Sequence, residues 1–221
     1  MSIHPQVRVT VRPYGSVVPL GFFAFGIGMF LYAAYDAAWV KAAEGHTVGL
    51  MLVSFVAPLE LLATVIAFLA RDTVAGVALG LFTGSWLLTG FATMQAKPGQ
   101  LSAAQGYFSI AFCVAVGLLA SVAWLGQPLM AVVLSASLVR GLCSAVYQLG
   151  GGAGWNHVGG WLALAIYCVA MYGGLAFLLE DVRGHAVLPL KRRGSSREAI
   201  EGDMTTQLAG LENEAGVRKH L

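Results

Sequence analysis

The sequence predicts an all-α membrane protein with six transmembrane helices. Six apolar stretches follow one another between Val18 and Leu179. Each is about as long as the ~20 residues that a helix needs to span a hydrocarbon core ~30 Å thick. Of the 221 residues, 57% are hydrophobic and 11% are charged, whereas a soluble domain carries about 25% charged residues. The chain is therefore expected to lie mostly in lipid.

We expect the spans at Val18–Val40, Thr47–Leu69, Val74–Thr93, Gln105–Leu125, Pro128–Leu149 and His157–Leu179. The connections between them are short, so consecutive helices are predicted to be antiparallel neighbours. They also leave no room between the spans for a catalytic domain outside the membrane. The predicted organisation is an N-terminal segment at 1–17, a transmembrane transport domain at 18–190 and a polar tail at 191–221.

The distribution of lysine and arginine predicts the orientation of the bundle. Ten of the 13 Lys and Arg residues fall on the side that holds both termini, and only Lys41 and Lys97 fall on the other. The remaining cation, Arg140, lies inside the fifth span. Cytoplasmic loops of membrane proteins carry an excess of Lys and Arg. We therefore expect both termini in the cytoplasm and the bundle in the plasma membrane, which in a bacterium is the inner membrane.

Small residues are expected to bring the helices close together. The chain has 28 glycines, and the third span carries Gly76, Gly80 and Gly84 at helical spacing. Such residues let the backbones of membrane helices approach each other closely. The spacing alone leaves two roles open, which are packing within one protomer and contacts between subunits or along a pore.

Several classes of function lack support in the sequence. No basic stripe with interleaved aromatic residues indicates nucleic-acid binding. The three cysteines lie in three different apolar stretches without metal-ligand spacing. Motifs of intramembrane or soluble hydrolases such as G-x-S-x-G and H-E-x-x-H are absent. We therefore expect no enzyme activity, no metal and no cofactor.

Two ionisable residues fall near the middle of predicted spans. Glu60 lies in the second span and Arg140 in the fifth. An unpaired charge at the bilayer centre costs roughly 2.5–3.5 kcal/mol on insertion scales. Either the two residues pair in the bundle interior, or they face water in a cavity, or Glu60 is protonated. A kink at Pro58, which removes a backbone hydrogen bond, could also place Glu60 beside water.

Other polar and aromatic residues have simpler explanations. Asp36 and His157 fall at the outer ends of the first and sixth spans, where capping or interfacial anchoring accounts for them better than contact with a solute. Trp86 lies deeper and is expected in the bundle core rather than against a substrate. The tail beyond Gly194 is rich in Glu, Gly, Ser and Thr and is expected to be solvated.

Three segments carry motifs that occur together in one family. Residues 18–26, V-P-L-G-F-F-A-F-G, are similar to an entry motif N-P-A-P-L-G-L-x-G-F-G, and residues 84–87, G-S-W-L, fall where the family has Y-G-S-F-W. Residues 157–161, H-V-G-G-W, and 187–189, V-L-P, are similar to its last helix and its ending. Over about 16–189 the chain thus resembles the acetate uptake transporters, also called succinate–acetate permeases. Ser16, Val17 and Thr83 replace the motif's Asn, first Pro and aromatic residue.

The resemblance implies a homo-hexamer in membrane lipid, in which each protomer has its own path for a small carboxylate. It further implies an apolar constriction at Phe25, Thr83 and either Ser137 or Leu138, made wider or more polar by Thr83 and Ser137. Additional candidates along the path, some from the motifs and some from their charge, are Ser16, Pro19, Gly21, Ser85, Trp86, Glu60, Arg140 and His157.

The function predicted from these features is membrane transport of acetate or related small carboxylates such as succinate. Crossing as the protonated acid, or together with a proton, reduces both the dehydration cost and the electrical cost of moving an anion. The alternatives are a channel or transporter for another small solute, such as ammonium or formate, and a membrane scaffold that acts through its C-terminal tail without transporting anything.

Overall fold

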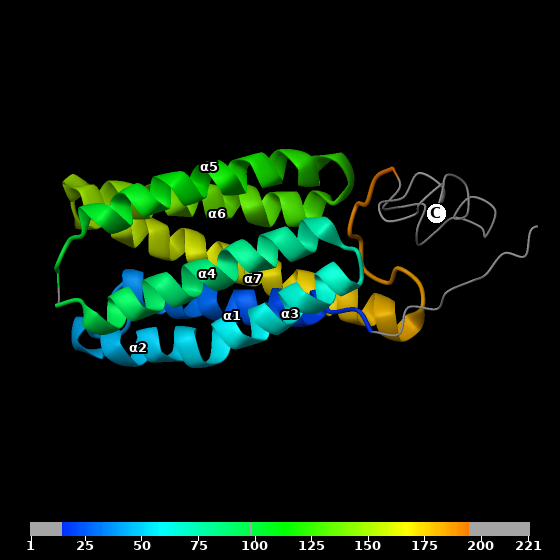
Figure 1. Cartoon of the computed structure of the whole chain (residues 1–221), viewed down its shortest axis with the longest axis horizontal. Coiled ribbons are helices and arrows are strands. Elements are labelled where there is room, and N and C mark those ends of the chain that lie inside the picture. Colours follow the sequence, from blue (N-terminus) through cyan, green and yellow to red (C-terminus); the bar gives the residue numbers. More distant parts are fainter. Residues whose placement is uncertain (1–14, 98, 195–221) are drawn as a thin grey trace, which may run out of the picture.

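The structure, a computed structural model, describes residues 15–97 and 99–194. Most of the predicted N-terminal segment and the tail beyond Gly194 lie outside these residues. Within them, long helices lie side by side along one axis, and their connections are at two ends (Figure 1). The start of the first helix and the end of the last are at the same end, as an even number of spans requires.

The helical elements of the described chain follow one another with few irregular residues between them. Their bounds are α1 Val18–Asp36, η1 Ala42–Glu44, α2 Gly45–Met51, η2 Leu52–Val56, α3 Ala57–Leu69, α4 Thr73–Gln95, α5 Ala103–Gly126, α6 Pro128–Val146, η3 Tyr147–Gly151 and α7 Ala153–Arg183. Here η1 is a short 3₁₀ turn, whereas η2 and η3 are π-helical turns.

The prediction of an all-α fold with six spans is confirmed within the described residues, where six helical stretches are long and apolar enough to cross a membrane. The second span is α2, η2 and α3 read as one stretch, Ala42–Leu69, and the fifth is α6 with η3, Pro128–Gly151. The first span is shorter than expected and ends at Asp36, because the chain turns at Ala38, where φ is 60°. The sixth is longer and runs from Ala153 to the left-handed Gly184, where φ is 69°.

The helix starts follow ordinary capping chemistry. The Asp72 side chain accepts a hydrogen bond from the Ala75 N–H at 3.1 Å at the start of α4, and Ser102 accepts one from Gln105 at 3.3 Å at the start of α5. Each satisfies one of the backbone donors that a helix leaves free at its N-terminus. Pro128 begins α6, where its missing N–H costs nothing.

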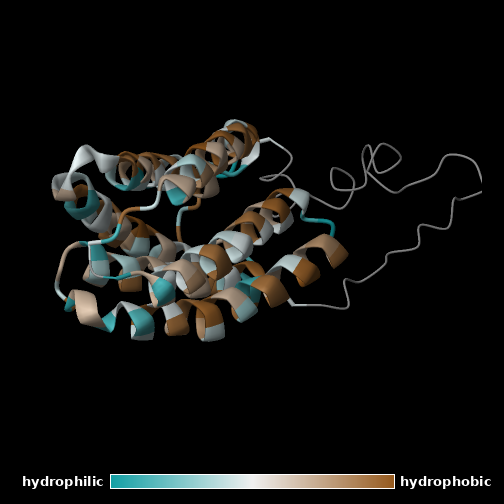
Figure 2. Ribbon diagram, turned by 60° about the vertical axis from the view of Figure 1, so that its left-hand side comes forward, coloured by the Kyte–Doolittle hydropathy of each residue, from teal (hydrophilic) through white to brown (hydrophobic). Residues whose placement is uncertain are grey.

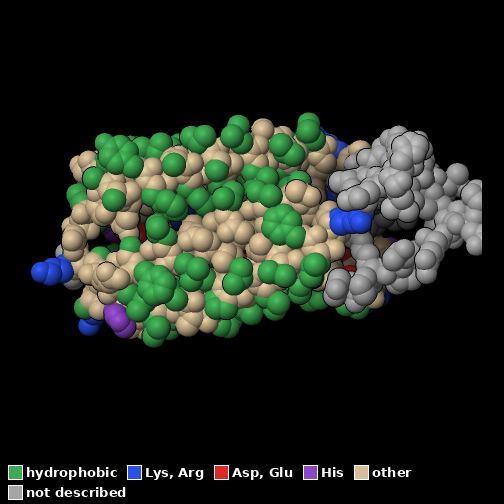
Figure 3. Space-filling model, in the orientation of Figure 1, with side chains coloured by type: hydrophobic (Ala, Val, Ile, Leu, Met, Phe, Trp, Pro, Cys, Tyr) green, Lys and Arg blue, Asp and Glu red, His purple; other side chains and the backbone are tan. Residues whose placement is uncertain are grey.

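The bundle surface is apolar along its length and charged at its ends. Large exposed side chains such as Phe55, Leu118 and Trp161 point outward, and the ribbon is largely hydrophobic along the helices (Figure 2). On the face shown in Figure 3, hydrophobic side chains cover the helices, and Lys and Arg gather at the ends. This is the surface expected of a protein whose sides contact lipid.

The closest helix approaches use glycine. A Cβ atom on Gly49 of α2 would lie 2.4 Å from the backbone oxygen of Gly90 in α4. In the predicted glycine series of α4, Gly76 packs against Phe68 and Gly80 against Thr64, both on α3, while Gly84 faces open space. Two of the three glycines therefore pack within the protomer, and the third does not contact it.

Substituting Gly49 by alanine is expected to destabilise the protein by about 1–3 kcal/mol, the usual cost of forcing extra volume into a packed interface. The neighbour is a backbone carbonyl, which cannot rotate away. The melting midpoint of the purified protein in detergent measures the effect.

Gly84→Ala is the matched control, because nothing lies within 4 Å of the new methyl group. It should leave the melting midpoint unchanged or raise it, since alanine favours the helix. Equal midpoints for the two variants would contradict the close approach of α2 and α4.

Candidate functional site: a polar vestibule above an apolar waist

A polar cavity opens between α1, α4, α5 and α6 near the end that holds Lys97. We call it the Lys97-side vestibule; its volume is about 160 Å³. Hydroxyl and amide side chains dominate the polar part of its wall, including Ser85, Thr89, Gln105, Ser109, Ser137, Ser144, Gln148 and Asn156. A small hydrophilic solute could be solvated here without leaving the bundle.

Arg140 of α6 lies in this vestibule and is held by two neighbours. Its Nη2 donates a hydrogen bond to Asp36 Oδ2 at 2.9 Å, and both side chains are 13% exposed. Its guanidinium lies 4.1 Å from the centre of the Tyr32 ring, an attraction between a cation and a π face. The Tyr32 hydroxyl donates to Thr89, which fixes the ring beneath the charge. The membrane-buried cation is thus compensated.

Two donors beside this ion pair have no partner within the described protein. They are the Nε of Arg140 and the hydroxyl of Ser137, both buried. The residues are three apart on α6 and therefore share one face of the helix. A buried donor left unsatisfied costs about 1–3 kcal/mol. The vestibule therefore has hydrogen-bonding capacity that the protein itself does not use.

The vestibule ends at a cluster of aromatic rings. Phe25 of α1 meets Phe82 of α4 edge-to-face, with ring centres 4.8 Å apart, and Phe112 of α5 lies 5.3 Å from Phe82. Beyond them is a cavity of only about 20 Å³, lined by apolar residues such as Leu79, Phe82 and Leu134. That is room for about one water molecule. We call this region the apolar waist.

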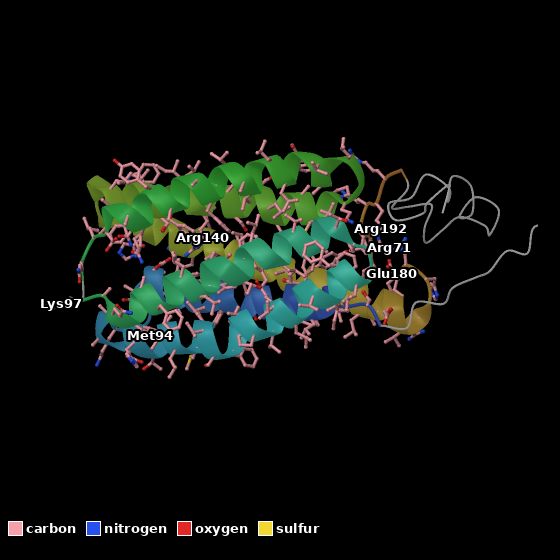
Figure 4. The ribbon with its side chains drawn as sticks, in the orientation of Figure 1. Arg71, Met94, Lys97, Arg140, Glu180 and Arg192 are labelled. Carbon is pink, nitrogen blue, oxygen red and sulfur yellow. The ribbon has the colours of Figure 1, made fainter. Side chains whose placement is uncertain are left out.

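A second vestibule lies on the other side of the waist. It has a volume of about 380 Å³ and is lined by Ser16, Asp72, Glu180 and Arg192, among others. Arg192 pairs with Glu180 at 2.5 Å and lies 5.3 Å from the Phe177 ring. We call it the Arg192-side vestibule. Figure 4 shows Lys97 and Arg192 at opposite ends, with Arg140 between them.

The three cavities form a series along the bundle. Phe82 lines both the Lys97-side vestibule and the waist, and Met130 lines both the waist and the Arg192-side vestibule. Their order along the helix axes is therefore vestibule, waist, vestibule. In this structure the waist holds no more than about one water molecule, and a larger solute would fit only if Phe25 and Phe82 moved apart.

Of the alternatives for Glu60 and Arg140, the one in which they pair with each other is wrong. Arg140 pairs with Asp36 instead, and Glu60 is completely buried with no hydrogen-bond partner for either carboxyl oxygen among the described residues. The indole N–H of Trp86 faces the Glu60 carboxyl without meeting hydrogen-bond geometry. The long arginine side chain reaches Asp36, the last residue of α1, beside the polar vestibule. A charge pair there loses less hydration than a pair between Arg140 and the completely buried Glu60 would lose.

The structure brings together some of the predicted site residues but not all. Ser85, Trp86, Ser137 and Arg140 line the Lys97-side vestibule, Phe25 and Gly21 line the waist, and Ser16 lines the Arg192-side vestibule. The remaining candidates, which line none of these cavities, are Pro19, Glu60, Thr83, Leu138 and His157.

Leu138 and Thr83 have other surroundings. The Leu138 carbonyl accepts from Cys113 of α5 at 3.4 Å, so this residue faces α5. Thr83 is buried and its hydroxyl has no partner among the described residues. His157 is exposed. Thr83, which the resemblance places at the constriction, does not line the waist, whereas its neighbour Phe82 does.

Sequence reasoning missed Phe82, Phe112, Tyr32 and the role of Asp36. A signal for Phe82 was present, because it directly precedes the position where the motif has an aromatic residue. For Asp36 the only signal was the need of Arg140 for a counter-ion. No group of three or more His, Cys, Asp or Glu side chains in residues 15–97 and 99–194 is placed to hold a metal ion.

These features define the class of the protein: a six-helix membrane bundle with one narrow internal path. No model of a known protein family matches the sequence, and no curated protein matches it either. Among solved structures, the bacterial acetate channel SatP matches with a TM-score of 0.71 and 18% sequence identity, over 80% of this chain and 99% of that one. The resemblance to the succinate–acetate permeases is thereby confirmed at the level of the fold. The matched protein is a channel and not an enzyme.

Glu60→Gln is expected to leave the melting midpoint in detergent unchanged or to raise it. The amide has the size of the carboxyl group and cannot carry a charge in a site without a partner. Glu60→Lys, which places a charge there that cannot be neutralised in the same way, should prevent folding or lower the midpoint strongly. A marked loss of stability in Glu60→Gln would mean that the carboxylate has a partner that the geometry does not show.

Proposed function

We propose that this protein is a membrane channel or transporter for acetate and related small carboxylates. The observation that carries the proposal is the series of two charged vestibules joined by an apolar waist, inside a fold shared with an acetate channel. The Lys97-side vestibule holds Lys97 and Arg140, which attract a carboxylate, and the narrow waist admits only a small solute. A small organic acid combines these two properties.

The waist favours passage of the protonated acid, or of the anion together with a proton. Its lining offers no polar group to replace the hydration shell of a carboxylate, and an unsolvated charge is costly in such surroundings. Entry of an anion into a cell with a negative interior costs a further ~2.3 kcal/mol per 100 mV. A neutral acid avoids both costs.

We infer that the Arg192-side vestibule faces the cytoplasm. Arg71, Arg183, Lys191, Arg192 and Arg193 lie at or near that end of the described chain, whereas Lys41 and Lys97 belong to the opposite end. The Lys97-side vestibule then faces outward. This follows the excess of Lys and Arg on cytoplasmic sides.

We further propose a homo-hexamer, as the resemblance to the permeases implies. Support comes from the broad apolar lateral surface, which gives room both for lipid and for neighbouring subunits. Gly84, which contacts nothing within the protomer, leaves a flat place on α4 where another backbone could approach.

A second candidate is a still smaller solute such as formate or ammonium. The narrow waist favours it, because about 20 Å³ holds only one water molecule. The two candidates differ in the size limit of transport and in the effect of a proton gradient.

Uptake of labelled formate, acetate, butyrate and succinate into liposomes containing the purified protein tests the proposal. Acetate flux should exceed that of empty liposomes and should increase when the outside is made more acidic than the inside, because more neutral acid is then available. Labelled methylammonium in the same liposomes tests the cation alternative. Acetate flux equal to that of empty liposomes at every gradient would refute the proposed function.

Widening the waist should relax the size limit. In Phe25→Ala and Phe82→Ala, each of which removes one of the two facing rings, the ratio of butyrate to acetate flux should rise several-fold. Phe30→Ala is the control, since Phe30 is also on α1 but is 41% exposed on its outer side. An unchanged flux ratio in both waist variants would show that these rings do not set the width.

A further inference from the structure

The guanidinium of Arg140 is only partly used by the protein. Its Nη2 donates a hydrogen bond to Asp36, and the guanidinium carbon lies over the Tyr32 ring. The Nε donor has no partner in the described chain although it is buried. An arginine kept only for structure would be expected to have its remaining buried donors satisfied as well.

Ser137 supplies a second unused donor on the same helix face. It is 6% exposed, its hydroxyl oxygen has no hydrogen-bond partner in the described residues, and it lines the same cavity as Arg140. It lies one turn of α6 closer to the waist, where Phe82 and Phe112 form the floor. Both residues therefore line the part of the vestibule next to the waist, where a solute would pause before entering it, and their two unused donors are covered by neighbouring protein atoms.

A carboxylate is the ligand that fits this arrangement. Its two oxygens can accept from two separate donors, and a hydrogen bond between charged groups is about twice as strong as a neutral one. The methyl group of acetate would then point to the aromatic floor. An alcohol or an amide would leave the guanidinium without a charge to pair with.

We propose that Arg140 Nε and the Ser137 hydroxyl form a carboxylate-binding subsite at the floor of the Lys97-side vestibule, and that Asp36 is a resident counter-ion that weakens it. The inference rests on the proposed function and assigns the residues that select the substrate class. It is distinct from the waist, which limits size.

The Asp36 counter-ion explains how a buried arginine can bind an anion without holding it so tightly that transport stops. An unpaired guanidinium in a low-dielectric site would hold an anion tightly. A conducting site must bind well enough to fill and weakly enough to empty. Asp36 shares the guanidinium with the incoming carboxylate and repels it, which lowers the affinity. Asn156, which also lies against the Asp36 carboxylate, helps to hold it in place.

The test compares half-saturation concentrations for acetate uptake in liposomes. Arg140→Lys keeps the positive charge and its pairing with Asp36 but has no Nε donor, so the half-saturation concentration should rise about tenfold, the usual value of one hydrogen bond to a charged group. Ser137→Ala should raise it by a smaller factor. Asp36→Asn should lower it and also reduce the maximal rate, because the anion leaves more slowly.

Two controls separate recognition from damage to the fold. Arg183→Gln removes an exposed cation at the end of α7, away from the path, and should leave the half-saturation concentration unchanged. Acetamide, a neutral molecule of the size of acetate, should cross each variant as it crosses the wild type. If Asp36→Asn does not fold, Arg140→Lys and Ser137→Ala, which leave no charge unpaired, still decide the role of the two donors.

Unchanged half-saturation in both Arg140→Lys and Ser137→Ala would overturn the subsite. An unchanged or higher value in folded Asp36→Asn would overturn the counter-ion role. If the wild type transports no acid at all, the proposed function fails instead. Equilibrium binding of labelled acetate to the full chain in detergent then tests the subsite by itself, and equal binding by wild type and Arg140→Lys would overturn it.

Discussion

The absence of water from the hydrocarbon core is the constraint on which the rest of this structure depends. Every backbone N–H and C=O group there must be satisfied inside the protein, so the crossing segments must be helices. The same absence makes the outer surface apolar and keeps exposed Lys and Arg at the ends. It also lets glycine rather than hydrophobic burial set the distance between helices such as α2 and α4. Inside the bundle, polar side chains such as Ser85, Ser137 and Arg140 line a cavity, whereas Glu60 and Thr83 are buried away from the cavities.

The two vestibules share one arrangement of charged and aromatic side chains, and the waist between them has none of the charged groups. Each vestibule holds an arginine that is paired with a carboxylate and lies against an aromatic ring: Arg140 with Asp36 and Tyr32, and Arg192 with Glu180 and Phe177. Between them the lining is entirely apolar. The charged groups of the vestibules and the rings that narrow the path are therefore different residues, and each set can change without the other.

The fold was largely predictable from the sequence, because apolar length alone identifies a membrane helix. The six spans and their order agree with what the apolar pattern indicated. Phe25, which the resemblance places at a constriction, lines the narrow waist. Span ends at Asp36 and Gly184 were less predictable, since they depend on single residues with positive φ at Ala38 and Gly184.

The site was predictable only in part. Arg140 and Ser137 could be named from their charge and from the motifs, but the partner of Arg140 could not. Glu60 and Asp36 were both available in the sequence, and the choice between them depends on how α1, α3 and α6 are arranged around the path. The composition of one helix does not show which face of a neighbouring helix that helix packs against. The same reason applies to Thr83 and Phe82, because one residue along a helix is a turn of about 100° and only Phe82 lines the waist.

The π-helical turn Leu52–Val56 determines which face of the second span Glu60 occupies. Such a turn inserts one extra residue into a helix, so everything after it is rotated by about 100° relative to α2. Glu60 follows the turn and is completely buried, while the next residue, Leu61, is 52% exposed to the lipid side. If the same sequence formed a regular α-helix through this turn, Glu60 would take the angular position that Leu61 has now, toward the hydrocarbon. The irregular turn is thus what keeps an acid in the second span compatible with insertion into a bilayer.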